Sequence, residues 1–200
     1  MKLTIAQIKN KLVNIHFSNS PPPLINKGLR GQWIQNTLGI PNSSDLLDLE
    51  DGELKVFQMG ESIAITQLKH CLNEIIYDEV DFENSKVGNK LKQVILICFS
   101  RDNQFIKYIH LNSENYPIEY QKIETDYSYI SKEIKSSFIN SYTLNTITGP
   151  NKFLQIRTKD SKTKGQYHPL IFENKLLKDK NMAFYLCPNF TRELLEKKLF

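Results

Sequence analysis

The sequence predicts an α/β or α+β protein in which helices flank a mixed central sheet. Amphipathic helical patterns occur near both ends of the chain, and several strand-like runs lie between them. The run 94–99 is apolar at every position, as expected for a central strand that is covered on both faces. At 200 residues, the chain is expected to fold as a single domain, 1–200.

Helical spacing predicts the first two elements. A helix is expected from residue 5 to about residue 17, because apolar residues recur there every three or four positions. Prolines at 21–23 cannot continue that helix and favour an extended connector. A second helix is expected over 27–38, because Gly39 follows it as a C-terminal stop.

The rest of the chain alternates strand-like and helical segments. Strands are expected over the ranges 53–59, 63–68, 93–100, 105–111, 153–157 and 184–187. Helices are expected at 71–80 and 119–139, and a polar, lysine-rich loop at 160–167. A last helix is expected after a cap that Asn189 or Thr191 supplies.

Composition favours a soluble protein of the cytoplasm. The three cysteines are odd in number and far apart, so we expect buried thiols in a reducing compartment. The four histidines form no zinc-ligand spacing. The chain has no signal-peptide pattern and no apolar stretch near the ~20 residues that cross a bilayer, so no membrane partner is expected.

Positive charge is concentrated near the C-terminus. Residues 151–200 hold 11 lysines and arginines against 5 acidic residues, a balance of +6, whereas the first 150 residues have a balance of −2. Such an asymmetry is typical of a surface that binds a polyanion such as DNA.

An acidic bend ahead of the strand at 53–59 is the main candidate for chemistry. Residues 45–55 read DLLDLEDGELK, and in a strand Glu53 and Lys55 share one face. Two carboxylates suit Mg²⁺, and a neighbouring lysine can activate water and offset charge on a phosphate. The pattern indicates metal-dependent phosphodiester hydrolysis; the alternative is a solvated loop before an ordinary strand.

Three separated stretches carry a family resemblance. The first is KGLRGQWIQNTLG at 27–39. The second is ELK at 53–55, followed by NKLK at 89–92 just before an apolar strand. The third is LQIRTK at 154–159 with FYLCPNFT at 184–191. In this order, and over nearly the whole chain, they resemble the MutH-like DNA endonucleases, a family of mismatch-repair and type II restriction enzymes.

The resemblance implies a PD-(D/E)xK nuclease with a restriction-endonuclease-like sheet and a Mg²⁺ cofactor. It implies that an aspartate of the bend, Glu53 and the backbone carbonyl of Leu54 hold the metal. The family usually leaves six residues between its aspartate and the glutamate. Seven residues lie between Asp45 and Glu53 here, and four between Asp48 and Glu53. A one-residue insertion would make Asp45 the ligand, while Asp48 remains an open alternative.

The same resemblance assigns the remaining catalytic roles. Lys55 would orient and activate the attacking water, and Lys90 would support the charge from a neighbouring segment. The family's glutamate of the first motif falls on Gln35, which is polar but lacks the charge that would help to hold a metal. Either slower catalysis or a substitute acid is therefore expected.

Double-stranded DNA is the partner that the resemblance implies. Arg157 and Lys159 are assigned to recognition, and both side chains can donate to the guanine acceptors O6 and N7. Lys162 and Lys164 are expected to contact phosphates irrespective of sequence. Tyr185 falls where the family's tyrosine approaches the adenine that methylation marks.

Three functions follow as hypotheses. The leading one is a restriction endonuclease that acts at GATC and is sensitive to adenine methylation. The second is a MutH-like nicking enzyme of mismatch repair, which would require a MutL-type partner. The third is a non-catalytic DNA-binding or allosteric domain; the intact pair of Glu53 and Lys55 argues against it, and Gln35 argues for it.

Overall fold

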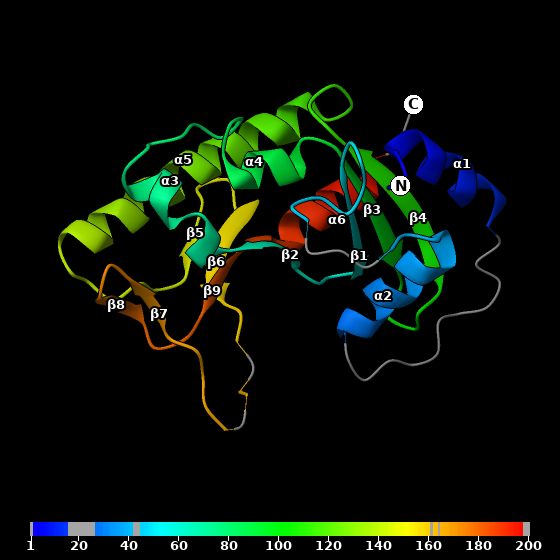
Figure 1. The fold of residues 1–200 in the computed structure, drawn as a ribbon. Coiled ribbons are helices and arrows are strands. Elements are labelled where there is room, and N and C mark those ends of the chain that lie inside the picture. The colour runs from blue at the N-terminus through cyan, green and yellow to red at the C-terminus, as the bar shows by residue number, and fades with distance from the viewer. Residues whose placement is uncertain (1, 16–26, 42–44, 161, 164, 198–200) are drawn as a thin grey trace. The chain divides into compact units, whose positions relative to one another are not determined.

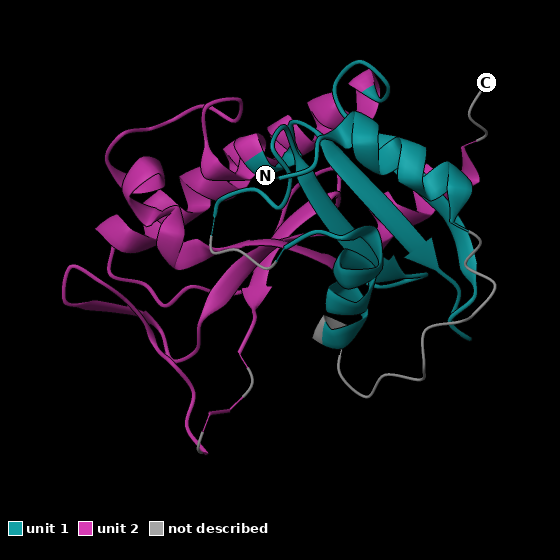
Figure 2. Cartoon of the chain, turned by 45° about the vertical axis from the view of Figure 1, so that its right-hand side comes forward, with its two compact units in different colours: residues 1–61, 90–116 teal, residues 62–89, 117–200 magenta. Residues whose placement is uncertain are grey.

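The computed structural model describes residues 2–15, 27–41, 45–160, 162–163 and 165–197 (Figure 1). Over these residues the chain is a mixed α and β protein with six α-helices and strands in three sheets. The mixed class is as predicted, whereas the strands do not form one central sheet. The chain divides into two compact units: unit 1 comprises residues 1–61 and 90–116, and unit 2 comprises residues 62–89 and 117–200 (Figure 2).

The sheet of unit 1 has three strands: β1 (Glu53–Gln58), β3 (Val94–Phe99) and β4 (Phe105–Leu111). The central strand β3 runs parallel to β1 and antiparallel to β4. All six residues of β3 are fully buried, which confirms the prediction that this apolar run is covered on both faces.

Two helices of unit 1 pack on one face of this sheet: α1 (Ile5–Asn14) and α2 (Lys27–Leu38). The packed cluster joins apolar residues of the helices, such as Ile8 and Ile34, to Leu54 of β1. A capping box at Thr4 begins α1, which ends at Asn14, earlier than predicted. The proline stretch at 21–23 lies outside the described residues.

Unit 2 contains a second, antiparallel sheet in the order β2 (Ile63–Gln67), β9 (Met182–Leu186), β6 (Leu154–Thr158) and β5 (Ile147–Thr148). The long helix α5 (Pro117–Ile139) packs on one face, where the rings of Tyr127 and Phe184 lie 5.9 Å apart. The short helices η1 (Leu68–His70) and α3 (Leu72–Ile76) follow β2, so the helix predicted at 71–80 is present but shorter.

A buried carboxylate fixes the beginning of β6. Asp126 of α5 is fully buried, and its Oδ2 accepts hydrogen bonds from the backbone N–H groups of Phe153 (2.8 Å) and Leu154 (2.9 Å). Its Oδ1 accepts the N–H of Asn151 at 2.7 Å. These bonds satisfy a buried charge and set the position of the strand that carries Arg157.

Several elements depart from the prediction. Helix α4 (Lys86–Leu91) and the hairpin of β7 (Leu170–Phe172) and β8 (Lys175–Lys178) were not expected. The last helix, α6 (Pro188–Glu196), begins at Pro188. The predicted capping role of Asn189 or Thr191 is wrong, because both residues lie inside this helix and proline at its first turn sets the starting φ.

The three cysteines, Cys71, Cys98 and Cys187, are buried free thiols, as predicted. Burial raises the pKa of Cys71 to about 12, and those of Cys98 and Cys187 to about 11. Thiols of this kind are protonated and inert at neutral pH. In the part of the chain that the structure describes, no helix has the length and apolarity that a bilayer crossing requires.

Candidate active site

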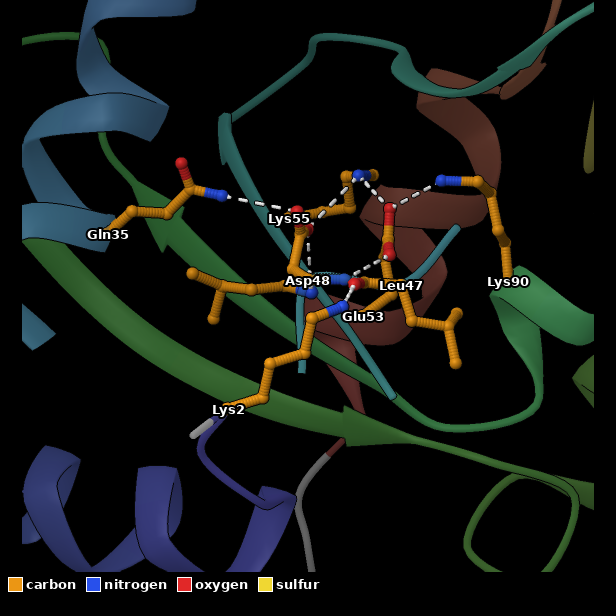
Figure 3. A network of polar contacts seen from close by, with 8 residues as sticks. Lys2, Gln35, Leu47, Asp48, Glu53, Lys55 and Lys90 are labelled. Atoms are coloured by element: carbon orange, nitrogen blue, oxygen red, sulfur yellow. Dashed lines mark hydrogen bonds and ion pairs between the residues drawn. The ribbon is translucent and has the colours of Figure 1, made fainter. Parts of the chain in front are cut away.

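A cluster of polar side chains surrounds the start of β1 in unit 1 (Figure 3). Its members are Gln35, Asp48, Glu53, Lys55 and Lys90. They come from α2, from the bend before β1, from β1 itself and from the end of α4. The bend and β1 are consecutive in the sequence, and α2 and α4 add one side chain each from more distant segments.

Glu53 is the centre of this cluster. Its residue is only 2% exposed, and its Oε1 accepts the ammonium groups of Lys55 and of Lys90, the latter at 3.0 Å. Its Oε2 accepts the backbone N–H of Asp48 at 3.1 Å. A carboxylate this deeply buried needs such partners, because an unpaired charge away from water is strongly destabilising.

Asp48 faces the same centre from the bend. Its Oδ2 accepts the backbone N–H of Leu54 at 3.3 Å and lies 3.6 Å from the Lys55 ammonium. Its Oδ1 accepts the side-chain amide of Gln35 at 3.3 Å. Asp48, Glu53 and Lys55 thus form one connected network at the start of the strand, with Gln35 at its edge (Figure 3).

Asp45, the aspartate that residue spacing favours, lies outside this network. It forms an ion pair with Lys2 at 2.9 Å, and its side chain is 62% exposed. The geometry therefore supports Asp48 as the partner of Glu53, not Asp45. Residue spacing favours Asp45, three positions upstream of Asp48, because spacing alone does not show that the chain folds back tightly between Asp48 and Glu53.

Gly52 makes this tight bend possible. Its carbonyl accepts the backbone N–H of Leu49 at 2.9 Å, and a Cβ at Gly52 would lie 2.5 Å from the carbonyl oxygen of Gln93. The next residue, Glu53, donates its backbone N–H to that same carbonyl at 2.9 Å. Any side chain at position 52 would push the start of β1 away. An Asp–Gly dipeptide such as Asp51–Gly52 is typical of a tight turn, so the sequence holds a signal for this bend.

The donor set fits a hard divalent cation. Among the described residues, no group of three or more histidine, cysteine, aspartate or glutamate side chains converges on one point. Mg²⁺, however, needs only one or two protein carboxylates, since it keeps several waters and binds substrate phosphates. Asp48 and Glu53 supply two such carboxylates, and the two lysines that meet Glu53 mark a place where positive charge is stabilised.

The residues assigned to DNA recognition lie in unit 2. Arg157 is exposed at the end of β6, and its guanidinium carbon is 4.4 Å from the ring centroid of Tyr185. The guanidinium therefore covers the ring that was expected to approach adenine. Tyr185 is 8% exposed, and this burial raises the pKa of its hydroxyl group. Lys159 is exposed, Lys162 lies 5.4 Å from the ring centroid of Tyr167, and Lys164 falls outside the described residues.

In comparisons with known proteins, the chain matches no protein-family model, and no curated protein matches it significantly.

Proposed function

We propose that the chain is a Mg²⁺-dependent endonuclease of double-stranded DNA, of restriction type, that acts at GATC and is sensitive to adenine methylation. The observation that carries the proposal is that Lys90, 37 residues away in the sequence, joins Asp48, Glu53 and Lys55 around one buried carboxylate. In a solvated loop ahead of an ordinary strand, Glu53 would be exposed to water and would not be buried with two lysine ammonium groups as partners.

Each side chain has a distinct task in this proposal. Asp48 and Glu53, with the Leu54 carbonyl, would hold the cation. When bound, Mg²⁺ lowers the pKa of a water and offsets charge on the scissile phosphate. Lys55 lies within reach of both carboxylates, so its ammonium would be placed to orient the attacking water beside them. Lys90 stabilises the negative charge that grows on the phosphate oxygens.

Unit 2 is the proposed DNA-reading part. Arg157 and Lys159 provide the donors that guanine O6 and N7 accept, and the basic excess of residues 151–200 provides attraction to phosphates. Arg157 has a preset orientation because it stacks on Tyr185 at 4.4 Å, and a stacked guanidinium loses less conformational entropy when it binds a base.

A non-catalytic DNA-binding module is the second candidate, and the amide of Gln35 favours it. Two carboxylates and two lysines already balance each other in the cluster, so the site is held together without a metal. A third carboxylate at position 35 would leave an excess negative charge in the cluster, which a bound metal ion would neutralise.

Incubation of supercoiled plasmid with and without Mg²⁺ separates these functions. The proposed restriction enzyme linearises the plasmid only when Mg²⁺ is present, and a Lys55→Met variant leaves it intact while still binding DNA. Accumulation of nicked circles would indicate a nicking enzyme of the mismatch-repair type. Binding without any cleavage by the unmodified protein would contradict the proposal and leave the binding module.

Replacing Gln35 with glutamate is expected to strengthen metal binding. The new carboxylate would lie beside Asp48 Oδ1, which the Gln35 amide now contacts at 3.3 Å. Like charges at this distance repel, so the metal-free protein should be less stable, and a cation should relieve the repulsion. We expect Gln35→Glu to shift half-maximal cleavage to a lower Mg²⁺ concentration, by roughly tenfold for each 1.4 kcal/mol of relieved repulsion.

Single-turnover cleavage rates across a Mg²⁺ titration measure this shift. Asn36→Asp is the matched control, because it adds a charge at the neighbouring position of α2, where the side chain is exposed. Equal Mg²⁺ requirements for Gln35→Glu and the unmodified protein would show that position 35 does not face the cation.

A further inference from the structure

One row of the unit 2 sheet places a second polar residue beside Arg157. Ala183 of β9 pairs with Gln67 of β2 on one side and with Arg157 of β6 on the other. Directly paired residues of neighbouring strands point to the same face of a sheet. The side chains of Gln67 and Arg157 therefore share one face, separated only by the small side chain of Ala183.

Lys159 and Asn181 lie two positions further along the same two strands, beyond the pair of Thr158 and Met182. The backbone N–H of Lys159 donates to the Asn181 carbonyl at 2.9 Å, which continues the alternation of β6 and β9. The Asn181 side chain then donates its Nδ2–H to Gln67 Oε1 at 2.7 Å. These residues line a cavity of about 390 Å³, whose walls are formed by Gln67, Lys69, Lys159, Asp160, His168 and Asn181.

The amide pair of Gln67 and Asn181 has one unused acceptor and one unused donor. Asn181 Oδ1 is buried and has no hydrogen-bond partner among the described residues. The described hydrogen bond of Gln67 uses its Oε1, and its Nε2 donates none within the same part of the chain. A buried acceptor without a partner is rare in folded proteins and indicates a group that is satisfied by a ligand or by water.

An amide pair of this kind is complementary to one edge of one base. Adenine presents its N6 amino group as a donor and its N7 as an acceptor side by side in the major groove. Asn181 Oδ1 can accept from N6, once the side chains that shield it from solvent in the free protein rotate away, while Gln67 Nε2 donates to N7. If both amides are rotated by 180°, the two roles exchange and the pair still offers one donor and one acceptor.

We propose that Gln67 and Asn181 form an adenine-reading site next to the guanine-reading Arg157 and Lys159. The inference rests on the proposed DNA-binding function and assigns the adenine of the target to this pair. The Tyr185 ring is then a platform for Arg157 and does not contact the base itself, since it is 8% exposed beneath the guanidinium. An N6-methyl group would add bulk at the atom that faces the pair.

The neighbouring residues support this role. Asp160 Oδ2 accepts the backbone N–H groups of His168 (2.8 Å) and Asn181 (3.3 Å), so it holds the backbone of one reader in place. Lys69 and His168 are exposed on the wall of the same cavity. The ammonium group of Lys69 and a ring N–H of His168 are donors that suit the phosphates on either side of the base that is read.

Selection of duplexes from a randomised pool by the full chain, in buffer without Mg²⁺, tests the site. The unmodified protein is expected to enrich one adenine next to a guanine. Gln67→Glu keeps the acceptor for Asn181 but removes the Nε2 donor, and Asn181→Leu removes both groups. Each variant should lose adenine discrimination by roughly 5- to 150-fold, which corresponds to about 1–3 kcal/mol per base contact. Gln121→Ala, which removes an exposed amide of α5, is the control that should keep it.

Substituted bases identify the atoms. A duplex with 7-deazaadenine lacks N7, so it should bind the unmodified protein more weakly and Gln67→Glu with no further loss. Thermal melting confirms that each variant is folded, and Gln67→Glu carries the test if Asn181→Leu is not. Unchanged adenine preference in a folded Gln67→Glu variant would overturn the reading site while DNA binding stands. Failure of the unmodified protein to bind any duplex would overturn both this site and the proposed function.

Discussion

Replacement of Glu53 by alanine is expected to lower the free energy of unfolding by about 3–5 kcal/mol, the usual cost of removing one partner of a buried ion pair. Glu53 is 2% exposed and accepts two ammonium groups, from Lys55 and Lys90, on one oxygen. Without it, these cations would face each other with little solvent around them. The backbone N–H of Asp48 would also lose its acceptor.

Urea denaturation of three variants measures this effect. Glu53→Gln keeps the shape and one acceptor, so it should cost less than Glu53→Ala. The double variant Glu53→Ala with Lys90→Met should recover part of the lost free energy of unfolding, because it removes one of the two lysine charges that Glu53→Ala leaves without a partner carboxylate at position 53. A Glu53→Ala variant within about 0.5 kcal/mol of the unmodified protein, the range of an ordinary surface substitution, would contradict the buried network.

Periodicity predicted the parts of the fold whose pattern is local. The apolar run of β3 could only be a buried element, and its six positions are indeed fully buried. Strand geometry likewise predicted that Glu53 and Lys55 share a face, and the Lys55 ammonium does donate a hydrogen bond to Glu53 Oε1. The resemblance implied a role for Lys90 at the site, but its ion pair with Glu53 was not predicted, because 37 residues separate the two and no periodicity spans that distance.

The choice between Asp45 and Asp48 could not be made from spacing. It depends on how closely the bend approaches β3, which is set by the absence of a side chain at Gly52 against the Gln93 carbonyl. A sequence shows that glycine stands at this position. It does not show which backbone atom lies 2.5 Å from where a Cβ would be.

The missed elements have similar causes. In α4, Gly88 lowers helix propensity, but a Cβ there would lie 1.7 Å from the carbonyl oxygen of Phe82, so glycine is needed for packing. Ser85 caps this helix by accepting the N–H of Gly88 at 2.9 Å. In the β7–β8 hairpin, Glu173 and Asn174 adopt φ of 48° and 62°, the conformation of a tight two-residue turn without the glycine that usually announces one.

The two aspartates of the bend are expected to differ sharply in their contribution to cleavage. Asp48 lies 3.6 Å from the Lys55 ammonium and shares the network of Glu53, so Asp48→Asn should remove a metal ligand. Removing a residue that only orients a metal ligand usually lowers metal affinity or activity by about 10–100-fold. For a direct ligand we therefore expect the cleavage rate to fall by more than roughly 100-fold. Asp45 pairs with Lys2 at the surface, and Asp45→Asn should leave the rate within about threefold, as expected when an exposed ion pair of less than 1 kcal/mol is lost.

The paired comparison of Asp48→Asn and Asp45→Asn tests the proposed active site most directly. Both substitutions are isosteric, and both side chains are at least partly exposed, with exposed fractions of 27% and 62%, so folding should be preserved in each. With Mg²⁺ and duplex DNA in single-turnover cleavage, the geometry predicts that Asp45→Asn cuts like the unmodified protein while Asp48→Asn does not cut. Cleavage that survives Asp48→Asn, or that is lost in Asp45→Asn, would contradict the assignment of this cluster as the catalytic centre.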